Sequence, residues 1–169
     1  MSKYLVVSVW LLAGTLAGAN PWRPSERFLS AVRYVESANG MFLFGDSGQS
    51  LGDFQISEAA WADVSSWRKE RNLPCYNYNR CAFNSRINRA YAADYLSLLQ
   101  GELKKKLNRN PSSSEIYAAY NMGIAQFAQC KYSLNQVNPV TLRKCQQINL
   151  ILQGRFPPDF NSSPRLASR

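Results

Sequence analysis

Glu36, a glutamate at the end of a predicted helix, is the residue of this sequence best suited to acid–base chemistry. It follows Val32 by four residues and Phe28 by eight, so the three share one apolar helix face, which should turn toward the interior. Glu36 also lies in the last turn, where the helix dipole opposes another negative charge. Both effects favour the protonated carboxyl group that a general acid requires. The alternative is a solvent-facing glutamate paired with Arg33 or another base.

Two downstream segments carry groups suited to holding a sugar. Residues 45–56 contain three glycines, which let backbone approach a ligand closely, and an amide that can bond to hydroxyl or acetamido groups. Residues 118–123 read A-A-Y-N-M-G and place a phenol and an amide at the end of a capped helix. The candidate substrate-binding residues are Ser47, Ser50, Gln55, Tyr120 and Asn121.

The remaining composition excludes several other chemistries. The chain has no histidine, which rules out a Ser-His-Asp triad, a Cys-His pair and an H-E-x-x-H metalloprotease helix. We therefore expect no metal and no cofactor. The four cysteines lack the C-x-x-C spacing typical of zinc sites. The pairs Cys75–Cys81 and Cys130–Cys145 would each close a short local loop, and we predict these as disulfides among three possible pairings.

The first nineteen residues have the pattern of a signal peptide. Lys3 is followed by an uncharged apolar run from Tyr4 to Leu16 and then by Ala-Gly-Ala at 17–19. A membrane span needs about 20 apolar residues, more than this run provides, although a retained signal anchor is the main alternative. We predict cleavage near Asn20, no membrane span afterwards, and a secreted or periplasmic protein in an oxidising compartment.

The elements that must position the candidate residues are mainly helical. Helices are predicted to start near Ser25, Ser57, Phe83 (running to Leu107), Ser112 and Asn138, with another over residues 124–132. Residues 41–56 should form a small hairpin or looped β region, and residues 72–82 a loop. Trp61 and Trp67 have the helical spacing of core residues. The fold class is therefore mainly α (α+β), as one domain over residues 20–153 with a disordered tail over residues 154–169.

The chain carries a net charge of +9, which attracts anionic polymers. Nucleic acid is one such polymer and the bacterial envelope another, and export favours the envelope. Solubility alone is the simpler explanation of the charge.

Three motifs in this order resemble those of the lytic transglycosylase and goose-type lysozyme group. They are Glu36-Ser37, then G-x-S-x-G-x-x-Q-I ending at Ile56, then A-A-Y-N-x-G ending at Gly123, and the resemblance covers roughly residues 25–150. It implies a lysozyme-like fold, a helical bundle with a small β-hairpin beside the active-site groove. Phe54 and Met122 depart from the usual Met and Ala, and the Cys75–Cys81 region is an unfamiliar insertion.

The resemblance also implies roles for the motif residues. Glu36 would be the catalytic acid that cleaves the β-1,4 bond between N-acetylmuramic acid (MurNAc) and N-acetylglucosamine (GlcNAc) in peptidoglycan. The segment with Gln55 would line the groove, and Tyr120 and Asn121 would support Glu36 and the sugar. A buried structural role is the alternative for Tyr120. A lytic transglycosylase needs no second carboxylate, whereas a hydrolase does. For that role Asp46 is the first candidate, ahead of Asp53 and the more distant Asp63, although Asp46 also suits a turn.

Two other functions stay open. The first is a non-catalytic, cationic cell-wall-binding protein on the same fold, which would not need Glu36. The second is a membrane-disrupting protein, which would show a basic amphipathic helix. Lys104, Lys105 and Lys106 are clustered, but their helix has a largely core-like face. We expect a monomer that acts on peptidoglycan, without a nucleic-acid partner.

Overall fold

Helices make up most of the computed structural model, which describes residues 22–45 and 48–157. Seven α-helices and the short 3-10 helix η2 lie in these residues, so the predicted mainly helical class with a small β element is confirmed. The helices are α1 (Glu26–Ser37), α2 (Glu58–Lys69), α3 (Tyr78–Cys81), α4 (Ser85–Leu107), α5 (Ser113–Met122), α6 (Ile124–Gln129), η2 (Leu134–Gln136) and α7 (Pro139–Leu152).

Most helix starts follow the capping signals of the sequence. Ser25 and Ser57 each accept a hydrogen bond from the third backbone amide of α1 and α2. Ser112 and Glu115 form a capping box at the start of α5. The Arg109 guanidinium bonds to Glu115 at 2.6 Å and lowers the pKa of that carboxyl group. Local chemistry therefore sets where these elements begin.

The β element is a three-stranded antiparallel sheet of short strands, β1 (Phe44–Gly45), β2 (Ser50–Leu51) and β3 (Ile56–Ser57). Phe44 pairs with Leu51, and Leu51 pairs with Ile56.

The turn between β2 and β3 packs tightly, through a glycine, against Ala82 at the end of α3 and Asn88 of α4. Gly52 has φ +80°, and a β-carbon there would lie 2.2 Å from the Ala82 carbonyl oxygen. The Asn88 amide accepts from Phe54 N at 2.9 Å and donates to Leu51 O at 3.2 Å. The sheet is therefore fastened to the start of the long helix.

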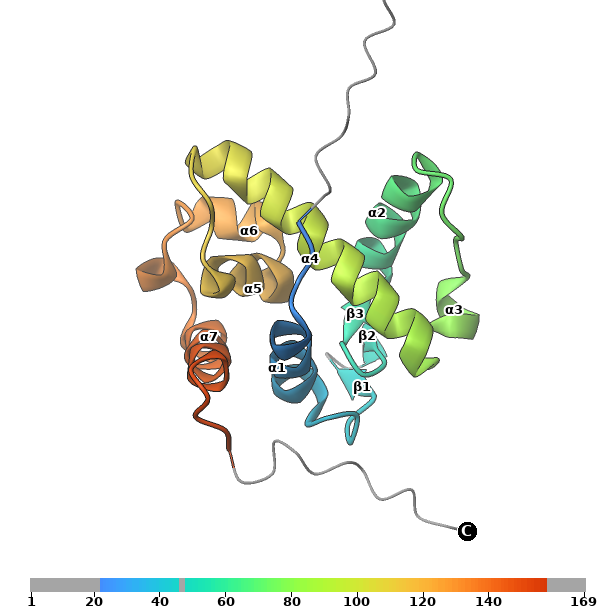
Figure 1. Ribbon diagram of the computed structural model, residues 1–169, viewed down its shortest axis with the longest axis horizontal. Helices are drawn as coiled ribbons and strands as arrows, with labels where there is room; N and C mark the ends of the chain where they lie inside the picture. Colours follow the sequence, from blue (N-terminus) through green and yellow to red (C-terminus); the bar gives the residue numbers. More distant parts are fainter. Residues whose placement is uncertain (1–21, 46–47, 158–169) are drawn as a thin grey trace, which may run out of the picture.

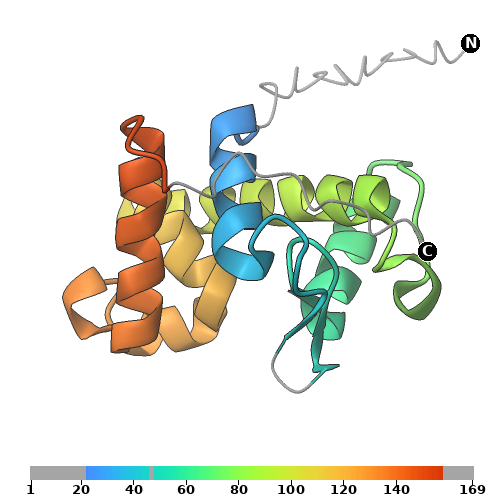
Figure 2. The same cartoon turned by 90° about the horizontal axis from the view of Figure 1, so that it is seen from below.

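Helix α4 runs across the molecule and joins its two sides (Figure 1). It contacts α5 on one side and α2 on the other, and α1 lies between these groups. Figure 2 shows α1 and α7 side by side, with the sheet on the opposite side of α1 from α7. The buried core spans both sides and includes Phe28, Val32, Leu96, Tyr117 and Ile148.

Some sequence predictions differ from the structure at element ends. The long helix begins at Ser85 because Asn84 caps it, and Phe83 stays 43% exposed. The predicted helix over residues 124–132 ends at Gln129, since Lys131 and Tyr132 adopt left-handed backbone angles. The predicted loop at 72–82 contains the short helix α3.

The two tryptophans predicted for the core have different surroundings. Trp61 is buried and stacks on Tyr91 with ring centroids 3.7 Å apart, which confirms the prediction. Trp67 is half-buried, with the guanidinium groups of Arg71 and Arg23 at 4.2 and 6.0 Å from its ring. Its placement in the core is therefore wrong, because two arginines cover it instead of apolar side chains.

All four cysteines are free thiols in this structure, so neither predicted disulfide is present and both pairings stay predictions. Cys75 Sγ donates to Ser65 O at 3.3 Å, and Cys145 Sγ donates to Ser114 O at 3.5 Å. Burial raises the pKa of the Cys145 thiol to about 11.

The predicted signal peptide and most of the predicted tail lie outside the described residues. Within residues 22–45 and 48–157, no helix is long and apolar enough to cross a membrane. In the same part of the chain, no cluster of three or more Cys, Asp or Glu side chains could hold a metal ion.

Candidate active-site cleft

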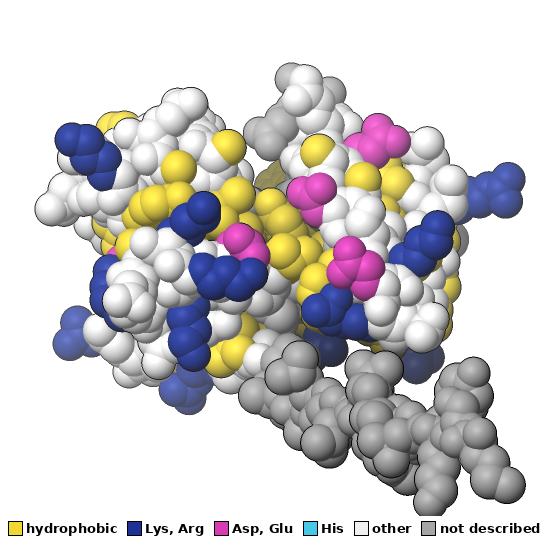
Figure 3. Space-filling model, turned by 90° about the horizontal axis from the view of Figure 1, so that it is seen from above, with side chains coloured by type: hydrophobic (Ala, Val, Ile, Leu, Met, Phe, Trp, Pro, Cys, Tyr) yellow, Lys and Arg dark blue, Asp and Glu magenta, His cyan; other side chains and the backbone are white. Residues whose placement is uncertain are grey.

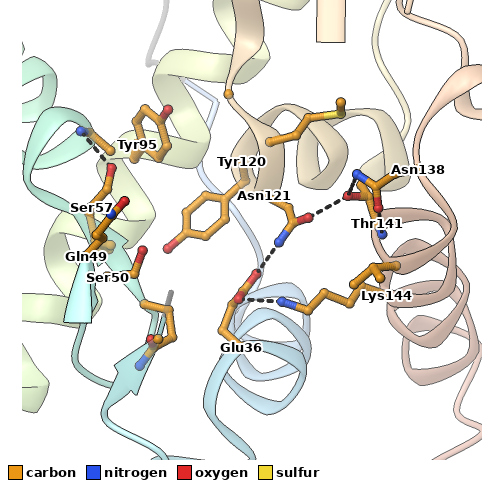
Figure 4. Close-up of a pocket in the computed structure, with 17 residues that line it drawn as sticks. Glu36, Gln49, Ser50, Ser57, Tyr95, Tyr120, Asn121, Asn138, Thr141 and Lys144 are labelled. Atoms are coloured by element: carbon orange, nitrogen blue, oxygen red, sulfur yellow. Dashed lines mark hydrogen bonds and ion pairs between the residues drawn. The ribbon is translucent and has the colours of Figure 1, made fainter. Parts of the chain in front are cut away.

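Glu36 lies at the bottom of a cleft between the sheet and the helices α5 and α7 (Figure 4). The cavity has a volume of about 470 Å³, and the Glu36 side chain is only 7% exposed. Its helix neighbours Phe28 and Val32 are buried, as their shared face predicted. The sequence therefore placed this carboxylate correctly on the inner face of α1.

Three side chains from α5 and α7 hold the two carboxylate oxygens. Tyr117 Oη donates to Oε1 at 2.5 Å, and Asn121 Nδ2 approaches the same oxygen at 3.4 Å. Lys144 Nζ bonds to Oε2 at 2.9 Å and forms an ion pair with it. Oε1 is thus held from α5, whereas Lys144 is the only described partner of Oε2.

Tyr117 is the tyrosine that contacts Glu36, which sequence reasoning missed. Tyr120, the expected partner, instead donates to the Phe54 carbonyl oxygen at 2.6 Å while still lining the cleft. Burial first, and then the Glu36 charge, raise the pKa of Tyr117 well above its usual value. A spacing signal existed, because Tyr117 precedes Asn121 by one helical turn and so shares its face.

A chain of hydrogen bonds fixes the Asn121 amide. Thr141 Oγ1 donates to Asn121 Oδ1 at 2.7 Å, and Asn138 Nδ2 donates to Thr141 Oγ1 at 3.0 Å. The Asn121 oxygen is therefore occupied, and its nitrogen faces Glu36 (Figure 4). Asn138 also caps α7, so the helix start and the site share one network.

The sheet forms the opposite wall, where the predicted residues Ser50 and Gln55 line the cleft. The Gln55 amide nitrogen is already engaged, because it donates to Phe42 O at 3.0 Å and Gly52 O at 2.7 Å. Gln55 has φ +47°, and its buried Oε1 has no hydrogen-bond partner among the described residues. The Gln55 amide nitrogen thus ties the turn together, and sugar binding by Gln55 stays a prediction.

Two of the other candidate carboxylates, Asp53 and Asp63, do not line the cleft. Asp53 is buried elsewhere, bonded to Arg33 at 2.9 Å and to Ser85. Asp63 is exposed on α2. Asp46 and Ser47 lie outside the described residues. Among the described residues that line the cleft, Glu36 is the only carboxylate and Lys144 the only cation.

Charged side chains of both signs lie on one face of the molecule (Figure 3). Figure 3 shows Lys and Arg side chains spread over both halves of one face, and a hollow between the halves where hydrophobic side chains are exposed.

Comparison of the chain with protein-family models, with curated proteins and with solved structures gives no match. The site therefore has to be interpreted from its own geometry. It is a buried carboxylate that faces a polar cleft large enough for part of a chain-like ligand, with an ammonium group against one oxygen. Such an arrangement can deliver a proton to a bound ligand once the ammonium moves away.

Proposed function

We propose that this protein cleaves the MurNAc–GlcNAc bonds of peptidoglycan on a lysozyme-like fold, with Glu36 as the general acid. The observation that carries the proposal is a nearly buried carboxylate in the last turn of α1, opening onto a cleft between sheet and helices. The order of motifs along the chain supports the same activity. No other described carboxylate lines this cleft, so proton transfer there rests on Glu36.

The contacts assign different roles to the two oxygens of Glu36. Oε1 accepts from Tyr117 and faces the Asn121 amide, so it serves as an acceptor in this geometry. The transferable proton would therefore sit on Oε2, once Lys144 has moved away from it. From Oε2 the proton passes to the glycosidic oxygen while an oxocarbenium-like charge develops on the MurNAc ring.

For the second half of the reaction we propose the route of a lytic transglycosylase. The Glu36 carboxylate would take the proton of the MurNAc 6-hydroxyl, and that oxygen would close on the anomeric carbon to form an anhydro ring. These two steps return the proton to Glu36 and need no second carboxylate. This route uses Glu36, the carboxylate that the described residues bring to the cleft, whereas a hydrolase would use Asp46, which lies outside the described residues.

Cell-wall digestion tests the proposal. We expect the purified protein to clear suspended peptidoglycan and Glu36→Gln to lose about 10²- to 10⁴-fold of that rate, as expected for loss of a general acid. Asp63→Asn, the same chemical change at an exposed position away from the cleft, is the matched control and should keep the rate. Circular dichroism should show that both variants are folded.

Mass analysis of the released fragments identifies the reaction. Anhydro-MurNAc ends would support the transglycosylase, and reducing ends would indicate a hydrolase that uses water. Equal rates for the wild-type protein and Glu36→Gln would remove Glu36 from the mechanism. Binding to peptidoglycan without any cleavage would instead indicate a non-catalytic wall-binding protein.

A further inference from the structure

Lys144 has no role in the motif-based interpretation, yet among the described residues that line the cleft it makes the only ion pair. Its ammonium lies 2.9 Å from Glu36 Oε2, and its side chain is 26% exposed, whereas that of Glu36 is 7% exposed. The lysine is therefore the partner that an incoming ligand can reach. Its flexible four-carbon stem can swing, while Glu36 is held at Oε1 by α5.

The surroundings of Lys144 suit a negatively charged group. Asn138, the N-cap of α7, and Thr141, in its first turn, lie on the same wall of the cleft (Figure 4), and Val140 also lines the cleft. The positive end of the α7 dipole therefore points to this region and adds to the lysine charge. No other cation lines the cleft in the described part of the chain, so an anionic ligand there would meet Lys144.

We propose that Lys144 is a receptor for a substrate carboxylate, and that this carboxylate competes with Glu36 for the ammonium group. The inference rests on the proposed function for the identity of the substrate, a glycan with acidic substituents. In the free protein Lys144 neutralises Glu36. When the glycan binds, the Lys144 side chain moves and its ammonium pairs with the glycan carboxylate. Glu36 then takes up one proton from solvent. The acid is then formed only when an acidic glycan occupies the cleft.

The exchange of partners at Lys144 can be monitored by measuring proton uptake, because few charged groups of the described residues face Glu36. From α7 there is Lys144, from α5 there are Tyr117 and Tyr120, and the described residues of the sheet contribute no charged group to the cleft. On α1 itself, Arg33 is paired with Asp53. Burial raises the pKa of both tyrosines well above the usual value, so they stay neutral at neutral pH. Among the described groups that line the cleft or face Glu36, this leaves Glu36 itself to take up a proton on binding.

Two sources of carboxylate exist in peptidoglycan, and the probes separate them. One probe is an alternating GlcNAc–MurNAc tetrasaccharide with free lactyl carboxylates. A second carries L-Ala-D-Glu on each lactyl group, so that its carboxylates lie on the peptide. The neutral probe is a tetrasaccharide of GlcNAc alone. All three have sulfur-linked glycosidic bonds, so the protein cannot cleave them during the measurement. Calorimetry in buffers of different ionisation enthalpy then gives the affinity for each probe and the number of protons taken up on binding.

We expect the wild-type protein to bind one or both acidic probes about tenfold more tightly than the neutral probe, with uptake of up to one proton. Lys144→Met should abolish both differences, and Lys144→Arg should keep most of the preference. The control Arg143→Met removes the same charge from an exposed neighbouring position that does not line the cleft, and it should behave as wild type.

Equal binding of acidic and neutral probes by the wild-type protein would overturn the inference, as would a preference that survives Lys144→Met in a folded protein. Carboxylate preference without proton uptake would overturn the competition with Glu36. The outcome is separable from that of the proposed function. A protein that prefers acidic glycans but cleaves none would refute the enzymatic role alone, and cleavage without preference would refute only the role of Lys144.

Discussion

The hydrogen bond between Tyr117 and Glu36 can be tested through protein stability, independently of any activity. Tyr117 is fully buried, and its hydroxyl donates at 2.5 Å to a carboxylate that is 7% exposed. A hydrogen bond to a charged group is worth about 1.5–3 kcal/mol. We therefore expect Tyr117→Phe to lower the free energy of unfolding by about 2 kcal/mol at neutral pH, where the tyrosine is neutral because burial raises its pKa.

Tyr120→Phe is the matched control. It removes the same atom from the same helix, but that hydroxyl donates at 2.6 Å to the uncharged Phe54 carbonyl. The expected loss is about 1 kcal/mol, as for a hydrogen bond between neutral groups. Urea unfolding followed by circular dichroism gives both values if the transitions are two-state.

A double-mutant cycle with Glu36→Leu isolates the pair. When the carboxylate is absent, Tyr117→Phe should cost about 1.5 kcal/mol less than in the wild-type protein, whereas the cost of Tyr120→Phe should stay unchanged. A coupling between Tyr117 and Glu36 below about 0.5 kcal/mol would refute the contact. An equal coupling for both tyrosines would show that Glu36 does not distinguish them.

Other expectations concern the fold and the thiols. Gly52 and Gly48 both have positive φ, but only Gly52 is packed against other backbone. Gly52→Ala should lower the free energy of unfolding by about 2–4 kcal/mol, because the new β-carbon would lie 2.2 Å from a backbone oxygen. Gly48→Ala should lower it by only about 1 kcal/mol, because that site is open. Thermal unfolding would rank them, and equal losses would contradict the close approach. Glu115→Gln should lower the free energy of unfolding above pH 4.5 but not at strongly acidic pH. The pKa of Glu115 is lowered in the folded protein, so its ionised form stabilises the fold, and this stabilisation is lost as the pH falls through the folded-state pKa. Melting curves of the wild-type protein and Glu115→Gln at several pH values check this prediction. A stability difference between them that does not change with pH would contradict it. Without reductant, alkylation at pH 8 should modify exposed Cys75 much faster than Cys145, whose pKa is raised to about 11; no labelling until reduction would instead support the predicted disulfides.

The elements of this fold were predictable where local chemistry decides them. Serine caps at Ser25, Ser57 and Ser112 mark helix starts, and the 3.6-residue spacing assigned Glu36 to an inner face. Ends were less predictable, because the left-handed residues Lys131 and Tyr132 that follow α6 have no local glycine signal.

The composition of the site was only partly predictable because its residues come from distant segments. Glu36 and Asn121 follow from motifs, but the ion pair with Lys144 joins positions 108 residues apart. No local spacing indicates that contact, since it depends on how α7 packs beside α1. Gln55 was correctly placed at the cleft, yet its amide nitrogen bonds to backbone because the turn needs it.

The long helix α4 has a mechanical consequence. It touches α2 on one flank and α5 on the other, and its 23 residues form one uninterrupted rod about 35 Å in length. Because a single rod spans both flanks, the distance between them resists change unless that rod bends. The width between the two flanks is therefore set by the fold before any ligand enters the cleft.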